Sequence, residues 1–125
     1  MATKSVTGII PGIILIIVLV LFFVIISSTT NKSNTNYNVL KDYMTSDNIK
    51  YTLGIITDCN ISNYDIERDS SLDGLDGENT IGFRLKSPNY NLVMYLKDGN
   101  IYSLRYADND LYRNNTILNK IDEIK

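Results

Sequence analysis

The sequence predicts an α+β protein: an N-terminal transmembrane helix followed by a small domain with a three- or four-stranded antiparallel sheet and one or two packing helices. Three observations lead to this prediction. An unbroken apolar run lies near the N-terminus, alternating segments separated by turn residues fill much of the last third, and a helical apolar pattern ends the chain. The 125 residues leave room for one small domain after the apolar run.

The apolar run covers residues 8–28 and has no polar side chain between positions 13 and 26. As a helix, about 20 residues span the roughly 30 Å hydrocarbon layer of a bilayer. A soluble core helix would show a polar face, and a cleaved signal peptide would have a shorter apolar core of about 7–15 residues. We therefore expect an uncleaved anchor in the lipid bilayer, spanning it with Ile13, Leu15, Val18, Leu21, Phe22, Phe23 and Ile26.

The anchor divides the chain into four parts: a tail (1–7), the span (8–28), a polar spacer (29–38) and a small domain (39–125). Lys4 precedes the span while Lys32 and Lys41 follow it, so the positive-inside rule is nearly balanced. The tail carries no acidic residue and leaves the whole domain on the opposite side. We expect an extracytoplasmic domain, although the unpaired Cys59 mildly favours a reducing compartment.

Two segments ahead of the sheet carry helical or ambiguous patterns. Residues 37–45 place apolar side chains on one side at helical spacing and predict a short amphipathic helix. Residues 49–56 alternate as a strand would, yet Ile49, Leu53 and Ile56 also share one helical face. We favour the strand because the segment is rich in β-branched and aromatic residues, and the helix remains the alternative.

The sheet is the clearest part of the pattern. Residues 80–86, 91–97 and 100–106 predict three antiparallel strands. Asp98 and Gly99 join the last two, and an Asp-Gly pair between apolar runs is a strong signal for a type I′ turn, which needs positive φ at both positions.

The C-terminal segment carries two further patterns. The stretch "DLYRN", residues 110–114, predicts a brief fourth strand. Beyond it the apolar positions fall on one helical face, which predicts a helix packed on the sheet through Ile117, Leu118, Ile121 and Ile124.

Composition argues against several functions. With 12 Lys and Arg scattered among 14 Asp and Glu, the chain shows no basic face for a nucleic-acid partner. It has no His, the commonest general base near neutral pH. The lone Cys59 has no partner base and is expected to be a small buried hydrophobe. We therefore expect no catalytic residue and a non-enzymatic domain.

The acidic segment 65–78 is expected to be a solvated, mobile loop, with a calcium-binding or hydrolytic site as the alternative. Residues 69, 71, 73 and 74 match the first, third, fifth and sixth positions of a calcium loop. The twelfth position, which calls for a bidentate Glu, is Thr80. The candidate metal ligands are Asp69, Ser71, Asp73, Asp76 and Glu78.

Tyrosines gather on and beside the predicted hairpin. The two-residue turn is expected to place Tyr95 and Tyr102 opposite each other, with Tyr106 further along the strand. Cross-strand tyrosine pairs stabilise a sheet by about 0.2–1 kcal/mol. Packing is the favoured role, and a surface for a protein partner at Tyr95, Tyr102 and Tyr106 is the alternative.

The layout resembles type IV pilins and pseudopilins, because a Lys-containing leader ending in Gly8 precedes a long apolar helix and a small α+β domain. The run "IYSLRYADNDLYRNNTILNKI" is also similar to the strand–turn–strand end of minor pilins. The family's Glu, five residues beyond the processed Gly, is replaced by Ile13, and its aromatic or Met at the first mature position by Ile9. The resemblance implies a subunit of a surface filament or of a secretion or DNA-uptake pseudopilus, self-associating through the apolar helix, and it transfers no functional residue.

These patterns together predict a single-pass membrane protein. Its small domain would lie outside the cytoplasm as a non-enzymatic binding or assembly module of a membrane or cell-surface complex, with a protein partner.

Overall fold

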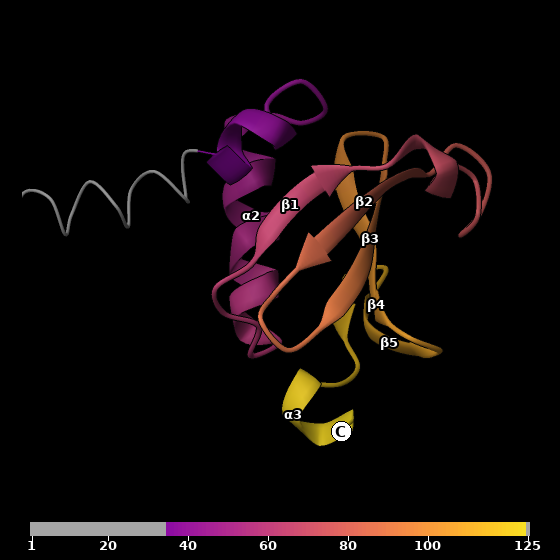
Figure 1. Ribbon diagram of the computed structural model, residues 1–125. Helices are drawn as coiled ribbons and strands as arrows, with labels where there is room; N and C mark the ends of the chain where they lie inside the picture. The colour runs from indigo at the N-terminus through magenta and orange to yellow at the C-terminus, as the bar shows by residue number, and fades with distance from the viewer. Residues whose placement is uncertain (1–34, 125) are drawn as a thin grey trace, which may run out of the picture. The chain divides into compact units, whose positions relative to one another are not determined.

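The computed structural model describes residues 35–124, and the predicted transmembrane segment 8–28 lies outside them. Figure 1 shows a twisted antiparallel sheet with one long helix against it. The sheet has six strands in the order β1-β2-β3-β4-β5-β6, each paired with the next one in sequence. The α+β prediction is therefore confirmed for this part of the chain. The expected strand number of three or four was too low.

The elements have simple bounds. After helical residues 35–40, they are α2 (Ser46–Asp58), β1 (Asp65–Arg68), the 3-10 turn η1 (Ser70–Leu72), β2 (Ile81–Lys86), β3 (Asn91–Lys97), β4 (Asn100–Tyr106), β5 (Asn109–Arg113), β6 (Thr116–Ile117) and α3 (Ile121–Ile124). Within this described stretch, every helix is too short or too polar to cross a membrane.

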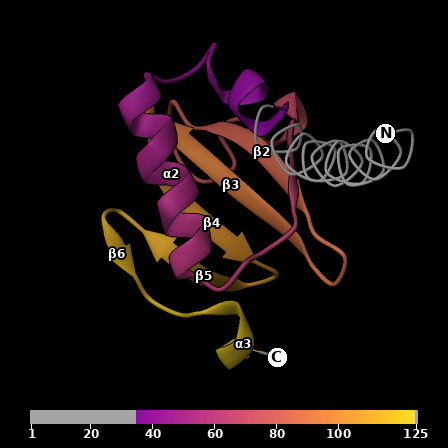
Figure 2. The same cartoon turned by 90° about the vertical axis from the view of Figure 1, so that its left-hand side faces the viewer.

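Helix α2 replaces the strand favoured for residues 49–56, so that prediction is wrong and its helical alternative is right. Thr45 caps the helix, since its side-chain oxygen accepts a hydrogen bond from the backbone N–H of Asn48 at 3.3 Å. Figure 2 shows α2 lying across one face of the sheet. The residues it buries follow a helical spacing: Ile49, Thr52, Ile55 and Ile56.

The core fills the space between α2 and this face of the sheet. Burying one large aliphatic side chain contributes about 1.5–3 kcal/mol, which outweighs a difference in strand preference of about 1 kcal/mol. The packing therefore decides the conformation of residues 49–56. The largest fully buried side chains are Tyr112, Phe83, Leu40, Ile49, Ile56, Leu85, Leu92, Met94, Leu96, Leu104, Leu111 and Ile121.

The segment before α2 is helical at residues 35–40 and then turns, so the predicted helix 37–45 begins earlier and ends sooner than expected. Residues 35–38 of the predicted polar spacer therefore belong to the folded domain. Asn36 fixes this segment to the sheet edge. It is buried, donates from Nδ2 to the carbonyl of Tyr64 at 3.2 Å, and accepts from the N–H of Ile66 in β1 at 3.0 Å.

The β3–β4 hairpin forms as predicted. Asp98 and Gly99 both have positive φ, of 53° and 76°, as a type I′ turn requires. A bulge follows, because Leu96 pairs with Ile101 but Tyr95 pairs with Ser103. Tyr102 is the extra residue, so the expected pairing of Tyr95 with Tyr102 is wrong.

The C-terminal end departs from the predicted long helix. Strand β5 confirms the brief fourth strand, but residues 116 and 117 then pair with it as β6. Helix α3 has four residues and buries Ile121. Ile117 and Leu118, expected to face the sheet from a helix, are 38% and 51% exposed.

The acidic segment is also more ordered than the predicted loop. It contains β1 and η1, and residues 69–80, here called the strap, fold over the face of the sheet away from α2. Leu72 of the strap is buried against Gly82 of β2, where an added Cβ would lie 2.2 Å from the Cβ of Leu72. A side chain at position 82 would therefore displace the strap.

We predict that Gly82→Ala lowers the free energy of unfolding by about 1–3 kcal/mol, because the new methyl group overlaps Leu72. Chemical denaturation of the full chain in detergent, followed by circular dichroism, measures this change. Gly54→Ala in α2 is the matched control, since its Cβ meets nothing within 4 Å. This control should stabilise the protein by about 0.5–1 kcal/mol. Equal effects at the two positions would contradict the packing argument.

Candidate functional site: a groove lined by tyrosines and amides

A groove of about 590 Å³ opens where α2, the β3–β4 turn and the β5–β6 turn meet. Small-molecule sites usually have volumes of about 300–1,000 Å³, so the groove can hold a ligand of that size. Tyr51 from α2 contributes one wall and the amides of the β5–β6 turn another. The complete lining is Tyr51, Lys97, Asp98, Asn100, Ile101, Tyr102, Asn114 and Asn115.

Two hydrogen bonds hold the walls of the groove together. Asn48 of α2 donates from Nδ2 to the carbonyl of Gly99 in the β3–β4 turn at 2.9 Å. The N–H of Asn114 in the β5–β6 turn donates to the carbonyl of Tyr102 at 2.9 Å. Each wall is therefore tied to the same hairpin.

The β5–β6 turn is a second two-residue hairpin turn. Arg113 pairs with Thr116, and the two residues between them have positive φ: 46° at Asn114 and 70° at Asn115. Asparagine tolerates this left-handed conformation better than most residues other than glycine. The Asn-Asn pair thus forms the turn and also lines the groove.

A chain of hydroxyl groups connects Tyr51 to this turn. Tyr112 accepts from the N–H of Asn115 at 3.2 Å and donates its only hydrogen to Oδ1 of Asn115 at 3.3 Å. The hydroxyl of Tyr51, 3.4 Å from that of Tyr112, must then be the donor in their contact. Burial raises the pKa of Tyr112 to about 12, so its proton stays in place at neutral pH.

Tyr102 is held between cationic groups. The Nζ of Lys97 lies 5.4 Å and the guanidinium carbon of Arg113 lies 5.5 Å from the centre of its ring. Cations within about 6 Å of an aromatic ring are attracted to its face. The ring is therefore fixed in the groove wall.

The acidic strap does not assemble the candidate calcium site. Across residues 35–124, no group of three or more acidic or cysteine side chains is placed to hold a metal ion. The strap carboxylates bind arginines instead: Asp73 accepts two hydrogen bonds from Arg68 at 2.6 and 2.7 Å, and Asp69 accepts from Nε of Arg84 at 2.5 Å. Ser71 donates to Asp69, and Glu78 is exposed.

Asp76 forms the other end of this arrangement. It accepts from Arg113 of β5 at 2.8 Å and from the hydroxyl of Ser103 in β4. Asp110 lies between Arg113 and Arg105, with each ion pair at 2.8 Å. Hydrogen bonds from Arg113 lower the pKa of Asp110, and those from Arg68 lower that of Asp73. The charges of this face largely neutralise one another.

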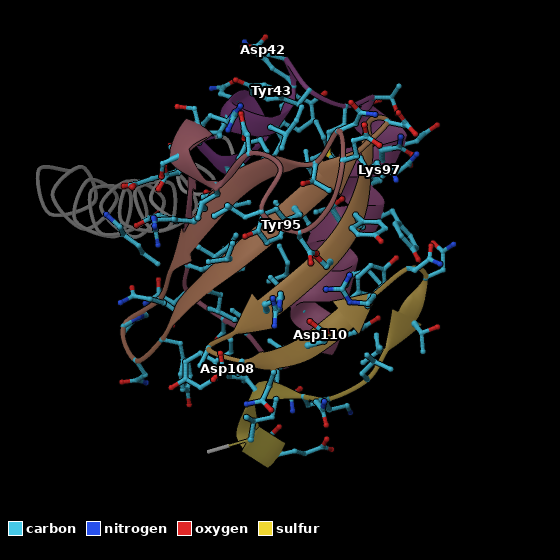
Figure 3. All side chains as sticks on the ribbon, turned by 90° about the vertical axis from the view of Figure 1, so that its right-hand side faces the viewer. Asp42, Tyr43, Tyr95, Lys97, Asp108 and Asp110 are labelled. Carbon is cyan, nitrogen blue, oxygen red and sulfur yellow. The ribbon has the colours of Figure 1, made fainter. Side chains whose placement is uncertain are left out.

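The three tyrosines proposed as a partner surface do not share one. Tyr95 is buried at the centre of the sheet face away from α2 (Figure 3). It pairs with Gly82 and Ser103, and the strap covers it because Leu72 packs on the first and Asp76 bonds to the second. The prediction of a surface role for Tyr95 is wrong for that reason.

The other two tyrosines have different surroundings. Tyr106 is half-buried and packs edge-to-face on Tyr90, with ring centres 5.6 Å apart. Tyr102 lines the groove described above. Cys59 is fully buried, in agreement with the expectation of a small core hydrophobe, and burial raises its pKa to about 11.

Sequence reasoning missed Tyr51 and the two asparagines of the β5–β6 turn. Tyr51 was assigned to a strand, but under the helical alternative it falls off the face shared by Ile49, Leu53 and Ile56. An exposed aromatic residue on an amphipathic helix was thus the available signal. "RNNT" between apolar residues was the signal for the second turn.

The chain was compared with protein-family models, curated proteins and solved structures, and no match was found. The groove and the strap are therefore interpreted from their own residues. The resemblance to pilins stays a prediction.

We predict that Asp73→Asn destabilises the protein at pH 7 and that the difference shrinks as the pH falls. The folded-state pKa of Asp73 is lowered, so its contribution is present above its ordinary pKa of about 3.9 and is lost as the pH falls through the folded value. Denaturation of both forms between about pH 7 and pH 2 measures this. Asp42→Asn, at an exposed position, is the control. A difference independent of pH would show that the ion pair is not its source.

Proposed function

We propose that this chain is a single-pass membrane protein whose apolar segment 8–28 anchors a non-enzymatic binding or assembly module outside the cytoplasm. The observation that carries the proposal is the run from Ile13 to Ile26, which is apolar on every side and long enough to span a bilayer with its flanks. A folded domain follows it closely, since residue 35 is already helical.

The described domain supports a binding role in two ways. Its groove is lined by partly exposed tyrosines and amides, side chains that supply contact area and adaptable hydrogen bonds. The titratable residues lining the groove are Tyr, Lys and Asp, and they include no hydrogen-bonded pair of nucleophile and base. This chemistry favours recognition over catalysis.

The anchor is tested by extraction of membranes with alkaline carbonate. We expect the full chain to stay in the membrane pellet, and we expect a Val18→Lys/Leu21→Lys variant to move to the supernatant. Each lysine at the centre of a span costs about 2.5–3.5 kcal/mol on insertion scales. A Lys50→Gln variant, changed at an exposed position of α2, controls for expression. Release of the unmodified chain by carbonate would refute the anchor.

The orientation is tested by labelling intact cells with a membrane-impermeant maleimide. Leu75 is 69% exposed on the strap, so Leu75→Cys should be labelled on intact cells if the domain is outside. The unmodified chain serves as the control, because its Cys59 is fully buried and its raised pKa keeps the thiol protonated. Labelling that requires lysis of the cells would place the domain in the cytoplasm.

An intact-mass measurement separates this proposal from a pilin-like subunit. Loss of residues 1–8 would indicate the processing that the pilin resemblance implies, whereas an intact N-terminus supports the anchor.

A further inference from the structure

The groove is close to electrically neutral. Its lining contains one cation, Lys97, and one anion, Asp98, at neighbouring positions of the β3–β4 turn. The remaining polar side chains are uncharged amides and phenols. A strongly charged ligand would therefore find no net opposite charge in the lining.

The ring of Tyr51 is held as a platform. Its side chain is partly open to solvent, with 48% of the residue exposed, while its hydroxyl donates to Tyr112 and so fixes the direction of the ring. The face of an aromatic ring is the negative side of its quadrupole and attracts polarised C–H groups. Pyranose rings present such C–H groups on their faces.

The polar groups around this platform are mixed in type. Lys97 supplies donors only and Asp98 acceptors only, while the side-chain amides of the asparagines supply both. The oxygen of Tyr51 has spent its hydrogen on Tyr112, so toward the groove it can only accept. Sugar hydroxyl groups both donate and accept, and they match such a set.

The lining fits an extended peptide less well. Peptides usually bind at a free strand edge or through apolar pockets for their side chains. Beside the groove, however, the carbonyl of Tyr102 is already bonded to the N–H of Asn114, and the one aliphatic lining residue, Ile101, is only 4% exposed.

We propose that this groove binds a short, neutral pyranose oligosaccharide, with one sugar ring stacked on Tyr51 and its hydroxyl groups bonded to the amides of the two turns. The proposal rests on the binding role proposed above and names its ligand class. It does not depend on the membrane anchor.

The test uses the full chain in phosphatidylcholine nanodiscs, which avoid detergents with sugar head groups. The probes are maltotetraose, cellotetraose and chitotetraose, together with an anionic tetragalacturonate. Saturation-transfer difference NMR detects contact, and titration calorimetry measures affinity. We expect at least one neutral probe to bind with a Kd between about 0.1 and 10 mM, more tightly than the anionic one.

Variants at Tyr51 connect the binding to the groove. Tyr51→Ala removes the platform and should weaken binding by about tenfold, whereas Tyr51→Phe keeps the ring and should weaken it by about threefold or less. Tyr37→Ala is the matched control, because Tyr37 is 40% exposed on the helical segment 35–40 and does not line the groove. Lys97→Gln is a second groove variant, expected to cost about two- to fivefold, should Tyr51→Ala not fold.

The proposal is overturned if no neutral probe binds at about 10 mM, or if the anionic probe binds best. It is also overturned if Tyr51→Ala and Tyr37→Ala change the affinity equally, or if a tyrosine- and asparagine-rich peptide binds at Tyr51 and no sugar does. A chain that carbonate releases but that still binds sugar refutes the anchor alone. One that stays in the membrane and binds no sugar refutes this inference alone.

Discussion

The packing of α2 against one face of the sheet is the interaction on which the rest of the domain depends. It buries the apolar residues of both partners, and it decides that residues 46–58 are a helix although several of them prefer strands. The same packing turns Tyr51 away from the core and toward the two hairpin turns. The groove therefore exists because a helix, and not another strand, covers this face.

Local patterns predicted the centre of the sheet well. Strands β2, β3 and β4 alternate strongly, and the Asp98–Gly99 turn adopts the conformation that its residues favour. The edge strands were harder to find, because β1 has four residues and β6 has two, too few to show a clear period. Strand β1 depends on Asn36, which is 30 positions away in sequence from the backbone N–H that it binds. No local pattern contains such a contact.

The candidate site was less predictable, because it depends on register and on long-range contacts. One bulged residue moves Tyr95 from Tyr102 to Ser103, and the strap then covers Tyr95. The acidic residues of the strap looked like metal ligands because a sequence shows acids without their arginine partners. Those arginines lie on β1, β2 and β5.

The strap also has a mechanical consequence. It is bonded to Arg84 on β2 at one end and to Ser103 and Arg113 on β4 and β5 at the other, so it braces strands that are not neighbours. Sliding β2 lengthwise against β5 would stretch these charged contacts together with the ladder between them. Tension along the strands would therefore be shared between the backbone ladder and a crosswise set of side-chain bonds, and the sheet should resist shear as a unit.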